Sequence, residues 1–319
     1  MNYELAIEVV SACIRDAARL CEDVRKDIPT ALQKEDKSPV TVADFGSQAL
    51  ICQALKQHFP DIPIVGEEDA TNLRNDSALP TAEKITAYVQ KIIPSATTTE
   101  VLNWIDYGNG QVRECFWTLD PIDGTKGFLR QDQYAIALAL IADGEVKLGF
   151  LGCPALQLRE GEMGWLFVAQ RGKGAYKIPL AGGEKSPLQV VSNNDASRFR
   201  FVESVEASHG NQELQNKIAQ SVGITSASVR VDSQAKYGIV SAGEAALYLR
   251  LPSPKYPDYR ENIWDHAAGA IIVEEAGGKV SDMYGKPLDF VTSVKMNDNR
   301  GVVVTNGIIH DVVIEAING

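Results

Sequence analysis

Cysteine is scarce in this chain of 319 residues. The five cysteines, Cys13, Cys21, Cys52, Cys115 and Cys153, are odd in number and widely spaced, and none of them forms a CxxC pair. A disulfide framework or a structural zinc site is therefore not expected. The pattern is typical of reduced, mostly buried thiols in a cytoplasmic protein.

Long apolar runs are absent as well, because no segment approaches the ~20 apolar residues that cross a membrane. Glu4, Glu8 and Asp16 argue against a transit peptide, which is poor in acidic residues. Basic residues are outnumbered, with 31 Lys and Arg against 42 Asp and Glu and a formal net charge of −11. Such a surface repels phosphate backbones, so neither nucleic acid nor a membrane is an expected partner. A small anionic substrate is still compatible with this charge if metals or a few basic side chains hold it.

The chain is longer than the size at which a single hydrophobic core usually stops growing, so we expect two units, residues 1–183 and 184–319. Apolar, β-prone segments and the hairpin signal Asp143-Gly144 predict an antiparallel sheet in the middle of the chain. Residues 70–110 are rich in Asn, Ser, Thr and Pro and are interpreted as a surface insertion, with a helix at 82–93 and a lid as its suggested role. Beyond the loop 179–187, alternating strands and helices predict a smaller α/β unit.

The most informative motif is DPIDGT at residues 120–125, which follows a predicted strand. The proline lets Asp120 and Asp123 converge on one point with a backbone carbonyl between them, and Mg²⁺ prefers such oxygen ligands. The backbone N–H groups of Gly124 and Thr125, at a predicted helix start, suit an anion. Metal ligands beside a phosphate cradle are what metal-assisted hydrolysis of a phosphate ester requires. The alternative is a pair of ordinary turns with solvated carboxylates.

Two further acidic clusters flank this motif in the sequence. Glu67, Glu68 and Asp69 follow a predicted strand at 61–65, where the alternative is a solvated loop. Asp265 stands at the start of a predicted helix, where the alternative is simple N-capping. The neighbouring His266 is interpreted as structural rather than catalytic.

In their order and separations, GEE (66–68), DPIDGT (120–125), WDHAAG (264–269) and EAGG (275–278) resemble the lithium-sensitive inositol monophosphatase superfamily of metal-dependent phosphatases. The resemblance extends over residues 38–290. Within that superfamily the chain looks most like the 3′(2′),5′-bisphosphate nucleotidases, which remove the 3′-phosphate of adenosine 3′,5′-bisphosphate. The segments that carry this finer resemblance are SPVTVAD (38–44), KGF (126–128), DSQAKY (232–237) and YLRLP (248–252).

The resemblance implies an α/β (α+β) fold, a layered αβαβα sandwich with the active site between the two units. It implies two or three Mg²⁺ ions, whose ligands would be Glu67, Asp120, the Ile122 carbonyl, Asp123 and Asp265. Asp44 and Thr125 would orient the attacking water. The substrate-binding residues would be Gly124, Thr125, Lys126, His209, Ser233, Lys236, Arg250 and Asp265.

The resemblance also implies a cytoplasmic enzyme, more often a monomer than an oligomer, that is inhibited by Li⁺ and clears a by-product of sulfate assimilation. Its partner would be a small nucleotide bisphosphate, with 3′-phosphoadenylyl sulfate as a further substrate. Bound metals lower the pKa of water and neutralise phosphate charge, and an in-line displacement needs no covalent intermediate. The lack of a Cys or Ser nucleophile motif agrees with this chemistry. Two alternatives stay open: a phosphatase for inositol phosphates or sugar bisphosphates, and an inactive nucleotide-binding regulator.

Overall fold

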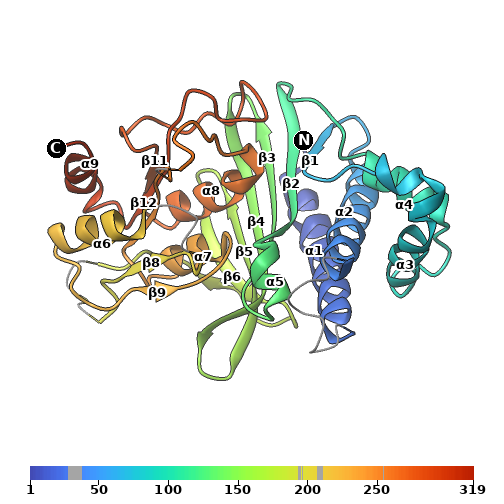
Figure 1. Cartoon of the computed structure of the whole chain (residues 1–319), viewed down its shortest axis with the longest axis horizontal. Helices are drawn as coiled ribbons and strands as arrows, with labels where there is room; N and C mark the ends of the chain where they lie inside the picture. Colours follow the sequence, from blue (N-terminus) through green and yellow to red (C-terminus); the bar gives the residue numbers. More distant parts are fainter. Residues whose placement is uncertain (28–37, 193–194, 196, 207–210, 254) are drawn as a thin grey trace.

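The computed structural model describes residues 1–27, 38–192, 195, 197–206, 211–253 and 255–319, and the side chains of all of these except 38–41. Five layers follow one another across the molecule: helices, a sheet, helices, a second sheet and a last pair of helices (Figure 1). The expected αβαβα sandwich is therefore confirmed. Within the described residues, no helix has both the length and the apolar composition needed to span a bilayer.

The larger sheet has the strand order β1-β2-β3-β4-β5-β6-β7. β1 runs parallel to β2 and the later neighbours pair antiparallel, which confirms the antiparallel sheet predicted for the middle of the chain. Asp143 and Gly144 connect β3 to β4 with φ values of 53° and 81°, as a tight hairpin turn requires. The strands are Ile64–Gly66, Cys115–Asp123, Ala135–Ala142, Glu145–Arg159, Glu162–Gln170, Gly174–Pro179 and Ser186–Pro187.

The central strand β3 shows why this sheet lies between two helical layers. All eight of its residues are buried, and large and small side chains alternate along it. Ile136 and Leu138 face the layer of α1 and α2, whereas Ala135 and Ala137 face α8. Small side chains let a helix approach closely, and a Cβ at Gly149 of β4 would come within 2.8 Å of the Ala268 carbonyl of α8. The sequence of β3 and β4 thus sets the spacing of the middle layer.

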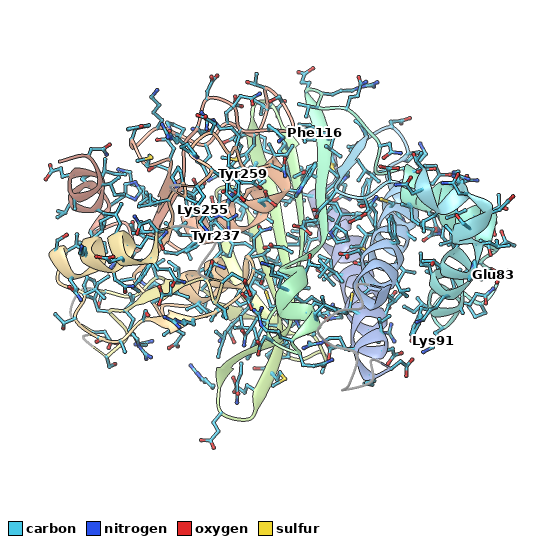
Figure 2. All side chains as sticks on the ribbon, viewed as in Figure 1. Glu83, Lys91, Phe116, Tyr237, Lys255 and Tyr259 are labelled. Atoms are coloured by element: carbon cyan, nitrogen blue, oxygen red, sulfur yellow. The ribbon has the colours of Figure 1, made fainter. Side chains whose placement is uncertain are left out.

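The first helical layer consists of α1 (Tyr3–Lys26), α2 (Ser38–His58), α3 (Leu79–Gln90) and α4 (Thr98–Asp106). The interpretation of residues 70–110 as a surface insertion is wrong. Ile85 and Val89 of α3 and Val101 and Ile105 of α4 are fully buried in the same core as α1 and α2. Only the outer face of this segment is exposed, where Glu83 and Lys91 extend into solvent (Figure 2).

The smaller sheet has the order β11-β12-β10-β8-β9, with α7 and α8 between it and the larger sheet. α6 and α9 cover its outer face (Figure 1). Its strands are β8 Phe201–Glu203, β9 Val229–Arg230, β10 Leu247–Arg250, β11 Lys279–Ser281 and β12 Val302–Thr305. The helices are α6 Gln212–Ser221, α7 Ala235–Ser241, α8 Ala267–Glu275 and α9 His310–Asn318.

The smaller α/β sheet begins at β8, after the loop that was expected to separate two units. The division into residues 1–183 and 184–319 stays a prediction. β7, at Ser186–Pro187, pairs with β6 of the larger sheet, and one hydrophobic cluster joins both sheets through α7 and α8. The two sheets therefore meet over a shared apolar layer, and their polar ends face one another at its margin.

Candidate active site

A cavity of about 340 Å³ opens between the end of β2, the short helix α5 (Thr125–Leu129) and the ends of β9, β10 and α7. Residues from both sheets line it, and so does Tyr259, which is labelled near the centre of the molecule in Figure 2. Nine of the residues predicted from the sequence line this cavity: Glu67, Asp123, Gly124, Thr125, Lys126, Ser233, Lys236, Arg250 and Asp265.

The ends of β1 and β2 place the first carboxylates. The backbone N–H of Glu67 donates to the Leu119 carbonyl at 3.1 Å, so Glu67 lies beside the neighbouring Asp120 of β2. The pairing of β2 with β3 shifts register between Asp120 and Asp123, and the Ile122 N–H donates to Asp120 Oδ1 at 3.1 Å. The DPID segment is thus an irregular strand end. Asp120 is 2% exposed, which excludes the alternative of solvated turn carboxylates.

Asp265 reaches the same cavity from the turn η3 (Ile263–Asp265). Its Oδ2 accepts a hydrogen bond from the Asn262 N–H at 2.9 Å, as part of a capping box. Asp265 is thus not the N-cap of the helix that follows, because His266 is the N-cap of α8, and the alternative of simple N-capping is wrong. The capping-box bond fixes the side chain of Asp265 in the cavity wall.

The acidic groups are buried close to one another, and this raises their pKa values. Burial, followed by repulsion from Asp265 and other carboxylates, raises the pKa of Glu67 to about 7, although a hydrogen bond with Asp120 opposes the shift. Burial and repulsion from Glu67 and Asp123 raise the pKa of Asp120 well above its usual range. Burial raises the pKa of Asp265 to about 6. Crowded, dehydrated carboxylates are destabilised when ionised, and a bound cation removes that cost.

Asp44 of α2 does not line the cavity. It is 6% exposed, and its pKa is raised by burial and by the charges of Glu68 and Glu67. Asp44 therefore lies near the GEE segment.

The residues at the start of α5 bring the two sheets together. Gly124 has a φ of +89°, and a Cβ there would lie 2.7 Å from the Ser233 Cβ. Only glycine combines this backbone conformation with so close an approach. The following residue, Thr125, is the first of α5 and lines the cavity beside Ser233.

Basic side chains line the same cavity. Lys236 is 3% exposed, and its Nζ donates to the carbonyls of Ser233 at 2.7 Å and Val231 at 3.2 Å. Burial lowers the pKa of Lys236 to about 8, although the charge of Asp123 opposes this shift. Arg250, at the end of β10, lines the cavity as well. An anion with two charged groups would therefore meet both carboxylates and cations in this cavity.

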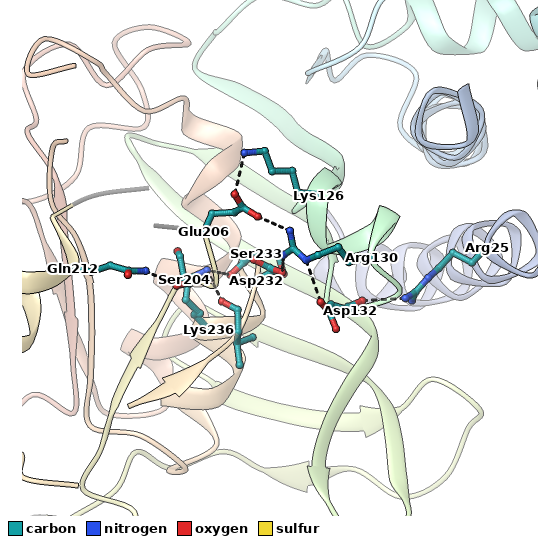
Figure 3. Close-up of polar contacts among 11 residues, drawn as sticks. Arg25, Lys126, Arg130, Asp132, Ser204, Glu206, Gln212, Asp232, Ser233 and Lys236 are labelled. Atoms are coloured by element: carbon teal, nitrogen blue, oxygen red, sulfur yellow. Dashed lines mark hydrogen bonds and ion pairs between the residues drawn. The ribbon is translucent and has the colours of Figure 1, made fainter. Parts of the chain in front are cut away.

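The mouth of the cavity carries an ion-pair network that the sequence analysis did not foresee (Figure 3). Lys126 Nζ lies 3.1 Å from Glu206 Oε2, and Arg130 pairs with Glu206 and with Asp232. Arg130 also lies 3.2 Å from Asp132. Lys126 and Arg130 belong to α5 and its C-cap, whereas Glu206 and Asp232 follow β8 and β9, so the network fastens the two sheets to each other at the site.

The structure thus gathers most of the predicted residues, but not all of them line the cavity. Asp120, Ile122 and Asp44 are buried and do not line it. His209 lies outside the described residues. Eight lining residues were not predicted as site residues: Gly127, Glu206, Asp232, Gln234, Tyr248, Tyr259, Glu261 and His266. Gly127, Asp232, Gln234 and Tyr248 lie in the segments KGF, DSQAKY and YLRLP, which were the available signal.

The residues present fit a hard divalent cation. Among the described residues, ligand atoms within 4.8 Å of one another are offered by Glu261, Asp265 and His266. Glu261 is already paired with Arg250, at 3.0 Å and 3.3 Å. The carboxylates with raised pKa values, Glu67 and Asp120, are the better donors, because neither forms an ion pair with a basic side chain of the described residues.

Comparison with known proteins gives a consistent picture. The model of the inositol monophosphatase family matches residues 1–319. A protein of Emericella nidulans named 3′(2′),5′-bisphosphate nucleotidase is 41% identical, over 99% of this chain and 98% of its own. A rice protein (Oryza sativa) of the same name is 42% identical, over 95% of this chain and 91% of its own.

Solved structures show the same fold at lower identity. An inositol monophosphatase from Anabaena (Nostoc) has a TM-score of 0.65 at 20% identity, covering 100% of this chain and 97% of its own. One from Zymomonas mobilis has a TM-score of 0.66 at 19% identity, covering 100% of both chains.

Proposed function

Because the chain belongs to the inositol monophosphatase family, we propose that it hydrolyses the 3′-phosphate of adenosine 3′,5′-bisphosphate to give AMP and phosphate. That it is a phosphatase follows from relatives about 41% identical over its whole length. The finer choice of substrate comes from the names of those relatives, 3′(2′),5′-bisphosphate nucleotidases.

One observation carries the proposal: buried carboxylates and basic side chains line a single cavity. Glu67, Asp123 and Asp265 line it together with Lys236 and Arg250. A substrate with one phosphate would use only the carboxylates, through cations held there. A substrate with two phosphates uses both sets of side chains, since the second phosphate neutralises the two basic ones.

Magnesium is the proposed cofactor, with two or three ions held by Glu67, Asp120, the Ile122 carbonyl, Asp123 and Asp265. When bound, Mg²⁺ lowers the pKa of water and neutralises the phosphate oxygens. Asp44 and Thr125 orient the attacking water for in-line displacement. Water oxygen bonds to phosphorus, the bond from phosphorus to the 3′ oxygen breaks, and a proton passes to that oxygen.

The remaining cavity residues hold the substrate in this proposal. Gly124 and Thr125 present backbone N–H groups to the hydrolysed phosphate, and Lys126 stands at the mouth. Ser233, Lys236, Arg250 and His209 hold the nucleotide and its second phosphate. We also propose a monomeric, cytoplasmic enzyme that is inhibited by Li⁺, accepts 3′-phosphoadenylyl sulfate and clears a by-product of sulfate assimilation.

The proposal is tested by phosphate release from a panel of esters at saturating Mg²⁺. Adenosine 3′,5′-bisphosphate should give a kcat/KM at least about tenfold above inositol 1-phosphate and fructose 1,6-bisphosphate. Asp123→Asn is the matched control and should abolish turnover of every ester. A higher kcat/KM for inositol 1-phosphate or the sugar bisphosphate would overturn the substrate choice. Nucleotide binding without any turnover would identify a regulator instead.

A further inference from the structure

Arg250 and Glu261 form a buried ion pair in the wall of the candidate active site. Arg250 Nε and Nη2 donate to the two carboxylate oxygens of Glu261 at 3.0 Å and 3.3 Å. The side chains are 23% and 12% exposed, so water screens the pair weakly. A guanidinium carries five N–H donors in a rigid plane. Once two of them are fixed on a carboxylate, the direction of the other three is fixed as well.

Glu261 also lies close to a buried histidine. The His266 Nε2 lies 3.6 Å from Glu261 Oε2, and the His266 Nδ1 lies 2.8 Å from the Tyr237 hydroxyl. Both His266 and Tyr237 are buried, at 3% and 0% exposed. Arg250, Glu261, His266 and Tyr237 therefore form a chain that leads from the cavity wall into the core between the sheets.

Charge supports the same arrangement. Burial alone raises the pKa of Glu261, but the His266 ring and the Arg250 charge lower it to about 2. The charge of Glu261 outweighs burial and raises the pKa of Arg250 above its ordinary value. Both groups are therefore ionised at neutral pH, and the ion pair is formed there.

We propose that Glu261 is a positioning residue that aims Arg250 at the substrate phosphate that is not hydrolysed. This rests on the proposed function and adds a determinant of specificity to it. Glu261 precedes the turn η3, which ends at Asp265. The same short segment thus positions Arg250 through Glu261 and contributes the carboxylate of Asp265 to the cavity.

The test compares adenosine 3′,5′-bisphosphate with adenosine 3′-monophosphate, which lacks the remote phosphate. Glu261→Gln keeps the size of the side chain but removes its charge. We expect about a tenfold rise in KM for the bisphosphate with kcat within twofold, and a change below twofold for the monophosphate. Adding Glu261→Gln to Arg250→Ala should weaken bisphosphate turnover no further, because both changes remove one interaction. The control is Glu213→Gln, which breaks an exposed ion pair with Lys217 on α6.

Equal losses on both substrates would show a merely structural role and overturn the proposal, as would additive losses in the double variant. If Glu261→Gln does not fold, Glu261→Asp is measured instead. Its shorter carboxylate should give a smaller rise in KM, again confined to the bisphosphate, and an unselective loss overturns the proposal. Failure of the wild-type protein to hydrolyse the bisphosphate would instead overturn the proposed function. The Glu261 variants test only the positioning of Arg250.

Discussion

The carboxylate of Asp123 accepts a hydrogen bond from the backbone N–H of Gln234, 111 residues further along the chain. The side chain of Gln234 continues the connection, because its Nε2 donates to the Trp264 carbonyl at 2.9 Å. Trp264 directly precedes Asp265 in η3. One buried residue thus joins two carboxylates, one at the end of β2 and one in η3, that line the same cavity.

Gln234→Leu should weaken Mg²⁺ binding. The variant keeps the backbone bond to Asp123 but loses the bond to the Trp264 carbonyl, so Asp265 is held less firmly relative to Asp123. Loss of such supporting bonds typically costs about 10–100-fold in metal affinity. The Mg²⁺ concentration at half-maximal activity, and the Mg²⁺-induced rise in Tm, measure it. Gln53→Leu, on the exposed face of α2, is the control. An unchanged Mg²⁺ requirement would contradict this role.

The candidate site was predictable to the extent that its residues lie in local motifs. Glu67 follows β1, Asp123 ends β2 and Asp265 ends η3, and all three line the cavity. The roles of Gln234 and Glu261 could not be predicted from the sequence, because they depend on contacts with other residues of the folded chain. Asp123 is 111 residues from Gln234, and Arg250 reaches Glu261 only because β10 ends beside η3.

The fold was predictable where the sequence has a long apolar segment or a clear turn signal. β3 is apolar along its whole length, and Asp143-Gly144 is an unambiguous turn. Residues 70–110 were misread because their overall polarity was weighed instead of their helical spacing. Ile85 and Val89 lie one helical turn apart in α3 and both are fully buried.

Mg²⁺ should stabilise the protein more at pH 7.5 than at pH 5. Folding raises the pKa of Glu67 from 4.5 to about 7 and that of Asp265 from 3.8 to about 6. Stability from these groups is present below pH 4 and is lost as the pH rises to about 7, because the folded protein then retains protons that the unfolded chain has released. A cation replaces those protons.

Thermal unfolding after EDTA treatment, with and without Mg²⁺, measures this effect. We expect a Tm gain at pH 7.5 at least about 4 °C larger than at pH 5. In the variant Glu67→Gln, the Tm gain caused by Mg²⁺ should differ less between pH 7.5 and pH 5. An equal Mg²⁺ effect at both pH values would argue against cation binding at these carboxylates.

Gly269→Ala should destabilise the fold by about 2–3 kcal/mol. A Cβ at Gly269 of α8 would lie 2.4 Å from Cγ of Tyr237, whose ring is fully buried and whose hydroxyl contacts His266. The helix must then move away from α7. Urea unfolding should show a lower midpoint with an unchanged slope. Combined with Tyr237→Leu, the substitution should cost less than the sum of the two, since the smaller side chain makes room. Additive costs would show that the ring is not the obstacle.

Binding of the second phosphate should weaken in alkaline solution. Burial lowers the pKa of Lys236 to about 8, so the side chain is mostly charged at pH 7 and mostly neutral at pH 9. We expect KM for adenosine 3′,5′-bisphosphate to rise above pH 8, by up to about tenfold per pH unit, while KM for adenosine 3′-monophosphate changes little. Lys236→Arg provides the matched variant, because a guanidinium stays charged over this range. The KM of Lys236→Arg should not rise in alkaline solution, even if its value at pH 7 differs from that of the wild-type protein. A flat KM from pH 7 to 9.5 in the wild-type protein, or the same rise in the arginine variant, would place the charge that holds the second phosphate elsewhere than on Lys236.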